Sequence, residues 1–242
     1  MISYMITNYK IDKALSESRI KADIDKAFEM AQKDGGAFSG WALSRQAITA
    51  FVVQLFQESV DTKHIVELGG GQSTLFWNAL SQVSDLPLRV DTYEHHPQWA
   101  AELSQKTAGS PSVQIHHVGL KQFSDETFQS FFQEGVDPQY ASLGRDVSDE
   151  DAEFTRIRNC FYDLDIQIFK DASIDGLIVD GPHGNGRSLA YPLFAKKLND
   201  KALVLVDDFD HYPFLEDATK VIDYEVMYRN RYKKRWVLLQ TL

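Results

Sequence analysis

Cysteine is nearly missing from this sequence of 242 residues, because Cys160 is the only one. A disulfide within the chain is therefore excluded, and a zinc site built on cysteine ligands is not expected. The chain also lacks any apolar run that approaches the about 18 residues of a membrane-spanning helix. Its first residues, Met1 to Tyr4, show neither the basic start nor the apolar stretch of a signal peptide. We therefore expect a cytoplasmic protein without a membrane partner.

A basic excess is missing as well. The chain carries 35 acidic and 25 basic side chains, which gives a formal net charge of −10. Non-specific binding to nucleic acid needs a basic surface, so no nucleic-acid partner is expected. Residues 121–171 hold much of the acidic excess, whereas residues 229–235 are strongly basic. A chain of this length and apolar content can bury a full core without cross-links.

The amino-terminal part of the chain has a helical pattern. Apolar residues follow helical spacing over residues 10–33, and Asp34-Gly35-Gly36 ends the pattern. A second helix is expected to begin near Ser44. We interpret residues 1–39 as a helical extension, which could pack on its own domain or on a second copy of the chain as a homo-oligomer.

After residue 61, short β-rich apolar runs alternate with amphipathic stretches. This alternation predicts a parallel sheet covered by helices on both faces. The last two runs are joined by too few residues for a crossover helix, so they must pair antiparallel. The fold class is therefore α/β, with a Rossmann-like, seven-stranded, mostly parallel sheet and an antiparallel last strand. Strands are expected at residues 64–68, 89–94, 113–118, 176–179, 202–206, 224–228 and 235–240, and helices at 74–83, 97–106, 189–198 and 214–222.

One connection is far longer than the others. Residues 120–173 form an insert before the fourth strand of a domain that spans residues 40–242. Long connections of this kind tend to be lids or binding elements, so we expect the insert to close over a bound ligand. Its aromatic side chains are expected to form a small core of its own, and they are Phe123, Phe128, Phe131, Phe132, Tyr140, Phe154, Phe161 and Tyr162.

The strongest candidate for a binding site is Glu67-Leu68-Gly69-Gly70-Gly71-Gln72-Ser73-Thr74. Glycine allows positive φ and lets a ligand approach the backbone, and the start of a helix offers free N–H donors. The next strand ends at Glu94, near the spacing at which an acid takes ribose hydroxyls. The third glycine of a dinucleotide-binding turn is missing, which favours a smaller, adenosine-type ligand.

This run resembles class I S-adenosylmethionine-dependent methyltransferases, as does Tyr93-Glu94-His95-His96-Pro97-Gln98-Trp99. Asp180-Gly181-Pro182-His183-Gly184, with Arg187 and Val206-Asp207-Asp208 further on, is similar to a subgroup with an Asp-Gly-Pro motif after the fourth strand. Many members of that subgroup act on sugars or glycans. The resemblance covers roughly residues 40 to 242, and it implies adenosylmethionine as the cofactor.

The resemblance also implies roles for single residues. Gly69 and Gly71 would form the turn under the methionine part of the cofactor. Glu67 and Ser73 would help to hold its amino and carboxylate groups, although Glu67 could instead be only an acid at a strand end. Glu94 would accept both ribose hydroxyls, a task that suits a carboxylate.

Three acids follow the fourth and fifth expected strands. Asp180 ends the fourth strand, and Asp207 and Asp208 end the fifth. Parallel strands end at one edge of the sheet, so these carboxylates would repel one another unless a cation, a base or a hydrogen bond compensates. Their spacing is similar to that of divalent-metal O-methyltransferases, in which such acids hold magnesium. Alternatively, Asp207 or Asp208 caps the next segment and Asp180 steadies the Gly-Pro turn.

Four residues are candidates for the base that removes a proton from the acceptor. His183 and His211 follow the same strand ends and titrate near neutral pH. Asp180 and Asp208 compete with them for this role.

The predicted activity is methyl transfer to a hydroxyl of a small molecule or carbohydrate. The bases at residues 229–235, with Arg187, would attract an anionic acceptor, unless they form only a solvated turn. One alternative activity is aminopropyl transfer to a polyamine. Another alternative is a catalytically inactive module that binds adenosylmethionine.

Overall fold

The computed structural model describes residues 2–57, 61–136, 139–152 and 157–242. The chain opens with α1 (Ile2–Glu17) and α2 (Lys21–Lys33). The prediction of one continuous helix over 10–33 is wrong, because the chain turns at Ser18, whose hydroxyl accepts a hydrogen bond from Ile20 N. α3 (Arg45–Leu55) begins as predicted after Ser44, whose hydroxyl accepts a hydrogen bond from Ala47 N at 3.1 Å.

A seven-stranded sheet forms the centre of the molecule, in the order β3-β2-β1-β7-β8-β10-β9. β1, β2, β3, β7 and β8 run parallel to one another, whereas β10 runs antiparallel to both β8 and β9. The predicted α/β fold class, with its antiparallel last strand, is therefore confirmed. The strands are β1 (Lys63–Leu68), β2 (Leu88–Glu94), β3 (Val113–His117), β7 (Ile174–Val179), β8 (Leu198–Asp207), β9 (Tyr224–Asn230) and β10 (Trp236–Thr241).

The connecting helices differ in how well the sequence predicts them. α4 (Gln72–Val83) and α5 (Pro97–Lys106) agree with the expected ranges. The stretch expected as one helix at 189–198 instead holds the 3-10 helix η3 (Asn185–Leu189), α8 (Ala190–Phe194) and a turn into β8. α9 (Phe214–Ala218) ends earlier than expected.

Two hydrophobic clusters cover the two faces of the sheet. Successive side chains of a strand point to opposite faces, so Ile65 belongs to one cluster and Val66 to the other. α2, α3 and α4 cover the first face, and the buried Ile24 and Phe28 of α2 belong to its cluster. The amino-terminal helices therefore pack on the sheet of their own chain. None of the described helices is long and apolar enough to span a membrane.

The insert contains a second sheet with the strand order β5-β4-β6. The expectation of a separate aromatic core is wrong, because Phe131 and Phe161 belong to the cluster that also holds Leu177 of the central sheet. Phe154 lies outside the described residues. The insert comprises β4 (Leu120–Gln122), α6 (Asp125–Gln133), the 3-10 helix η1 (Tyr140–Leu143), β5 (Arg145–Asp146), α7 (Asp149–Ala152), β6 (Cys160–Tyr162) and the 3-10 helix η2 (Ile166–Ile168).

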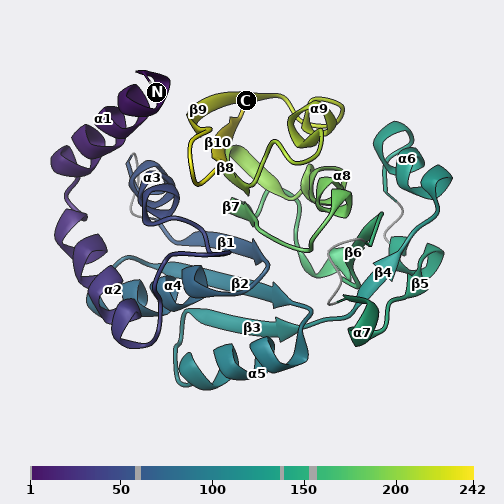
Figure 1. Cartoon of the computed structure of the whole chain (residues 1–242), viewed down its shortest axis with the longest axis horizontal. Helices are drawn as coiled ribbons and strands as arrows, with labels where there is room; N and C mark the ends of the chain where they lie inside the picture. Colours follow the sequence, from purple (N-terminus) through teal and green to yellow (C-terminus); the bar gives the residue numbers. More distant parts are fainter. Residues whose placement is uncertain (1, 58–60, 137–138, 153–156) are drawn as a thin grey trace.

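The insert lies at the edge of the sheet where the parallel strands end. Figure 1 shows the arrows of β1, β2 and β3 pointing toward the side on which β4, β5 and β6 lie. Ligands of open α/β sheets bind at this carboxyl edge. The fold therefore places the insert beside the predicted site.

Candidate functional site

The glycine turn after β1 brings two loops together. Gly69 has φ +94°, and a Cβ atom there would lie 2.7 Å from Gly181 N, so a larger residue would be strained and would collide with the backbone. Leu68 O accepts hydrogen bonds from Asp180 N at 2.9 Å and from Gly181 N at 2.7 Å. The turn and the Asp-Gly-Pro loop therefore form one continuous surface.

Glu67 lies beneath this turn and is fully buried. Its carboxylate accepts hydrogen bonds from Thr74 Oγ1 at 2.6 Å, Thr92 Oγ1 at 2.8 Å and Trp77 Nε1 at 3.3 Å. Burial raises the pKa of Glu67, against the effect of these hydrogen bonds. In this position Glu67 ties β1 and β2 to the first turn of α4.

Ser73 and Gly71 lie at the start of α4. Ser73 is buried beside Glu67, and Gly71 N donates to Thr74 Oγ1 at 3.0 Å. Glu67, Gly71 and Ser73 are not among the residues that line the cavity described below. Their contact with a cofactor therefore stays a prediction.

Glu94 ends β2 and does line the cavity. One carboxylate oxygen accepts a hydrogen bond from Gly70 N at 3.0 Å, and the other accepts one from His96 N at 2.7 Å. Burial raises the pKa of Glu94, and backbone N–H groups counteract this rise. His95 Nδ1 also lies 3.2 Å from Oε1, so the carboxylate is held in place at the cavity wall. Its acceptor capacity that these contacts leave over is open to a ligand hydroxyl.

The cavity wall beside Glu94 is formed by aromatic rings that the sequence pattern does not predict as ligand contacts. His95, His96 and Trp99 line it, and Trp99 is 56% exposed. Burial lowers the pKa of His95 to about 4, so its ring is neutral near pH 7. These rings offer flat surfaces beside a carboxylate.

Asp180 and Asp207 face each other across the ends of β7 and β8. Both line the cavity, and their carboxyl groups lie within hydrogen-bonding reach of each other. Burial raises the pKa of both groups, and mutual repulsion adds to the rise at Asp207. Two buried carboxyls this close are stabilised when they share one proton.

Asp208 is held by a different partner. Arg235 Nη2 donates to Asp208 Oδ1 at 3.1 Å and also contacts His211 Nε2, while Arg235 Nη1 lies 3.3 Å from Asp210 Oδ1. In the part of the chain that the structure describes, no group of three acidic, histidine or cysteine side chains is arranged to hold a metal ion. The predicted magnesium trio of Asp180, Asp207 and Asp208 is therefore not arranged as a set of metal ligands among the described residues, and a metal role for it stays a prediction.

His183 and Arg187 follow Asp180 on the loop that leads into η3. The His183 ring is exposed to the cavity, and partial burial together with the Arg187 cation lowers its pKa. Arg187 is buried and donates from Nε to Pro182 O at 2.9 Å and from Nη1 to Asp207 O at 3.1 Å. Arg187 thereby fixes the loop against the end of β8.

Trp41 reaches the same cavity from the segment between α2 and α3. Its side chain is 81% exposed, and its ring centroid lies 6.1 Å from that of His183. Lys234 Nζ holds this segment by donating to Gly40 O and, at 2.7 Å, to Ala42 O. Lys234 thus fixes the residues on either side of Trp41, and an exposed tryptophan held in this way is suited to contact a ligand.

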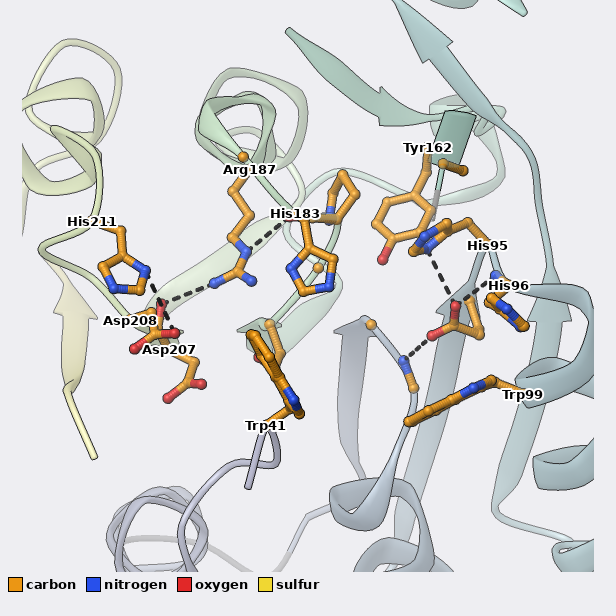
Figure 2. Close-up of a pocket in the computed structure, with 18 of the residues that line it drawn as sticks. Trp41, His95, His96, Trp99, Tyr162, His183, Arg187, Asp207, Asp208 and His211 are labelled. Carbon is orange, nitrogen blue, oxygen red and sulfur yellow. Dashed lines mark hydrogen bonds and ion pairs between the residues drawn. The ribbon is translucent and has the colours of Figure 1, made fainter. Parts of the chain in front are cut away.

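All these groups surround one cavity of about 620 Å³. Figure 2 shows Trp41 and Trp99 on one side of it and Arg187 and Tyr162 on the other. The structure therefore brings together Gly69, Glu94, Asp180, His183, Asp207, Asp208 and His211 of the predicted residues. It adds Trp41, Trp99 and Tyr162, whose place in the cavity depends on how distant segments pack.

Comparisons with known proteins give structural similarity only. No protein-family model matches the sequence, and no curated protein matches it. Among solved structures, the chain is similar to an S-adenosylmethionine-dependent O-methyltransferase from Thermotoga maritima, with 11% identity, a TM-score of 0.49, and coverage of 88% of this chain and 71% of that one.

Two other solved structures have comparable similarity. A tRNA methyltransferase from Aquifex aeolicus has 13% identity and a TM-score of 0.47, with 86% of this chain and 73% of that chain covered. A protein described as a putative O-methyltransferase from Klebsiella pneumoniae has 13% identity and a TM-score of 0.42, with 99% and 97% covered. The strand order and the antiparallel β10 give this chain a Rossmann-like α/β fold.

Proposed function

We propose that this chain is an S-adenosylmethionine-dependent methyltransferase that acts on a hydroxyl of a small molecule or carbohydrate. One observation carries the proposal: a single cavity joins the glycine turn and Glu94 to Asp180 and His183. A wall suited to a nucleoside and groups that can accept a proton therefore face the same cavity. Methyl transfer between two bound molecules needs this arrangement.

The residues present fit this cofactor. The cavity volume falls within the roughly 300–1,000 Å³ of small-molecule sites. Glu94 is oriented by Gly70 N and His96 N, and it can accept ribose hydroxyls with its remaining lone pairs. The acidic lining also suits a cationic sulfonium. Bound adenosylmethionine would supply a methyl carbon that its sulfonium makes electrophilic.

In this reaction a side chain of the protein must remove one proton from the acceptor hydroxyl. Asp180 and His183 both face the cavity, and the lowered pKa of His183 leaves its ring neutral at pH 7. Asp208 and His211 are weaker candidates for the base, because Arg235 binds both. Asp180→Asn and His183→Gln separate the two leading candidates, since only loss of the true base should lower kcat without raising the cofactor Kd.

The preference for an anionic acceptor rests on fewer groups than the sequence suggests. Lys234 and Arg235 of the basic segment are engaged with the Trp41 segment and with Asp208. Arg187 is committed to two backbone carbonyls. In this proposal Arg231 and Lys233 are the bases that attract the acceptor's charge, and Trp41 contacts its ring or chain.

Calorimetry with adenosylmethionine and adenosylhomocysteine tests the proposal. We expect both ligands to bind the purified protein, and Glu94→Gln to weaken both by at least about tenfold. The reason is that the glutamine amide places a donor where Gly70 N and His96 N already donate. Glu102→Gln is the matched control, because Glu102 lies on α5, pairs with Lys106 and does not line the cavity.

Product analysis distinguishes the alternatives. Adenosylhomocysteine formed with a hydroxylated acceptor supports methyl transfer. Methylthioadenosine formed from decarboxylated adenosylmethionine and a polyamine would instead establish aminopropyl transfer. Cofactor binding without turnover on sugars, phenols or polyamines would favour an inactive binding module. Absence of adenosylmethionine binding would refute both methyl transfer and the binding module, and absence of binding of its decarboxylated form would refute aminopropyl transfer.

A further inference from the structure

Tyr162 brings an unused hydroxyl into the cavity. Its side chain is fully buried and lines the cavity, and its Oη has no hydrogen-bond partner among the residues that the structure describes. A buried polar atom without a partner costs stability, so its presence calls for an explanation. Tyr162 ends β6, which places a residue of the insert inside the site.

The backbone next to this hydroxyl cannot donate to it. Gly69 N donates to Tyr93 O, and Gly181 N donates to Leu68 O. A Cβ atom on Gly181 would lie 2.3 Å from Tyr162 Oη, so the hydroxyl occupies space that only a glycine leaves free. Figure 2 shows the Tyr162 side chain reaching into the cavity between His183 and His95.

Contacts on both sides of β6 hold Tyr162 in this position. Tyr140 Oη donates to Tyr162 O at 2.6 Å and accepts from Leu164 N at 3.3 Å. Asn159 N donates to Asn185 Oδ1 at 2.9 Å, which ties the start of β6 to η3. The phenol is therefore oriented before any ligand arrives, and this lowers the entropic cost of a contact with it.

The site described above determines which part of a ligand this hydroxyl meets. A cofactor with its ribose on Glu94 and its reacting carbon toward Asp180 passes Gly69 and Gly181 between them. The sulfur would lie between the ribose and the reacting carbon, and the methionine arm would branch from this sulfur beside the two glycines. On that arm only the carboxylate oxygens can accept a hydrogen bond, because the ammonium group and the sulfonium cannot.

We propose that Tyr162 is a cofactor-binding residue whose Oη donates a hydrogen bond to the methionine carboxylate of adenosylmethionine. This inference rests on the proposed function and makes the insert part of the cofactor site as well as its cover. Burial and the nearby Glu94 raise the pKa of Tyr162, so the phenol keeps its proton and acts as a donor. A hydrogen bond to a carboxylate is stronger than one between neutral groups.

Calorimetry on Tyr162→Phe with two ligands tests this assignment. Adenosylhomocysteine carries the methionine carboxylate, whereas 5′-methylthioadenosine lacks the amino-acid arm. We expect the variant to bind adenosylhomocysteine about tenfold more weakly and methylthioadenosine within about twofold of the wild type. Tyr191→Phe is the matched control, because Tyr191 is also buried with an unpartnered hydroxyl but lies outside the cavity.

Each of the other results of these measurements would refute a different part of the proposal. Unchanged affinity of Tyr162→Phe for adenosylhomocysteine would refute the role of Tyr162. An equal loss for both ligands would refute the carboxylate as its partner. A melting temperature of the unliganded variant several degrees below the wild type would show that the hydroxyl has a structural partner, against the proposal. If the wild type binds neither ligand, the proposed function itself fails.

Discussion

Carboxyl groups that look alike in the sequence meet different surroundings in the structure. Glu67 is closed off beneath the glycine turn, whereas Glu94 opens on the cavity. Asp207 lies against Asp180, but the adjacent Asp208 turns to Arg235. The chemistry of each acid therefore follows from which neighbours the fold supplies, and the sequence shows only the strand end on which it lies.

The buried carboxyl of Asp207 should make stability depend on pH. Its pKa is raised from 3.8 to about 8, chiefly by burial and then by the charge of Asp180. The folded state thus holds the proton more tightly than the unfolded chain, so stability is greatest below about pH 4 for this group and is lost as pH rises toward 8. Asp207→Asn removes this loss because its amide is neutral and can still donate to Asp180.

Urea unfolding at pH 5 and pH 8 measures this effect. From pH 5 to pH 8, we expect the free energy of unfolding of the wild type to fall by at least about 1 kcal/mol more than that of Asp207→Asn. Asp171→Asn is the control, because Asp171 is an exposed acid whose pKa is lowered by Lys197. Equal pH dependence in the wild type and Asp207→Asn would show that Asp207 is ionised in the folded state.

Some residues of the site could be predicted from the sequence, and others could not, because their positions depend on how distant segments pack. Glu94, Asp180 and His183 could be predicted because each follows a strand whose end must lie at the ligand edge. Tyr162 and Trp41 could not, since neither lies at the end of a predicted strand. Tyr162 looks like any core aromatic until β6 is docked beside Gly181, and no local pattern gives that docking.

Among the elements, strands were easier to predict than helix ends. The strands are short apolar runs bounded by polar or glycine residues, and all seven expected runs occur in the central sheet. The break between α1 and α2 was missed, because the helical spacing of apolar residues continues through Ser18 and Ile20. The small sheet of the insert was missed because its strands have only two or three residues.

Docking of β6 on η3 relies on a glycine. A Cβ atom on Gly186 would lie 1.8 Å from Cys160 O and 2.6 Å from Cys160 N. Both atoms belong to backbone, which cannot yield as the end of a flexible side chain can. Gly186→Ala must therefore push β6 away, together with Tyr162 at its end.

We expect Gly186→Ala to lower the free energy of unfolding by about 2–4 kcal/mol. The same displacement should abolish the ligand-induced rise in melting temperature with adenosylhomocysteine. Gly119→Ala is the control for stability, because Gly119 has no atom within 4 Å of the position of its added Cβ. If Gly186→Ala melts and binds like the wild type, β6 is not held against η3.

At the scale of the whole molecule, the amino-terminal helices are part of one folded unit. The boundary predicted after residue 39 separates two sequence patterns, but the first hydrophobic cluster contains both Phe28 of α2 and Phe76 of α4. Their ring centroids are 4.4 Å apart. Arg45 of α3 also lies over the Phe28 ring, with its Cζ 4.4 Å from the ring centroid. Loss of the Phe28 side chain should therefore destabilise the whole chain.

Thermal and urea unfolding of Phe28→Ala test this unity. We expect the free energy of unfolding to fall by about 3–5 kcal/mol, because a fully buried aromatic side chain is removed. Thermal unfolding should still show a single transition, at a lower temperature. Tyr9→Ala is the matched control, because Tyr9 is a 68% exposed aromatic on α1, and it should change stability by less than about 0.5 kcal/mol. A separate early transition in Phe28→Ala, with adenosylhomocysteine binding retained above it, would mean that residues 1–39 fold apart from the sheet.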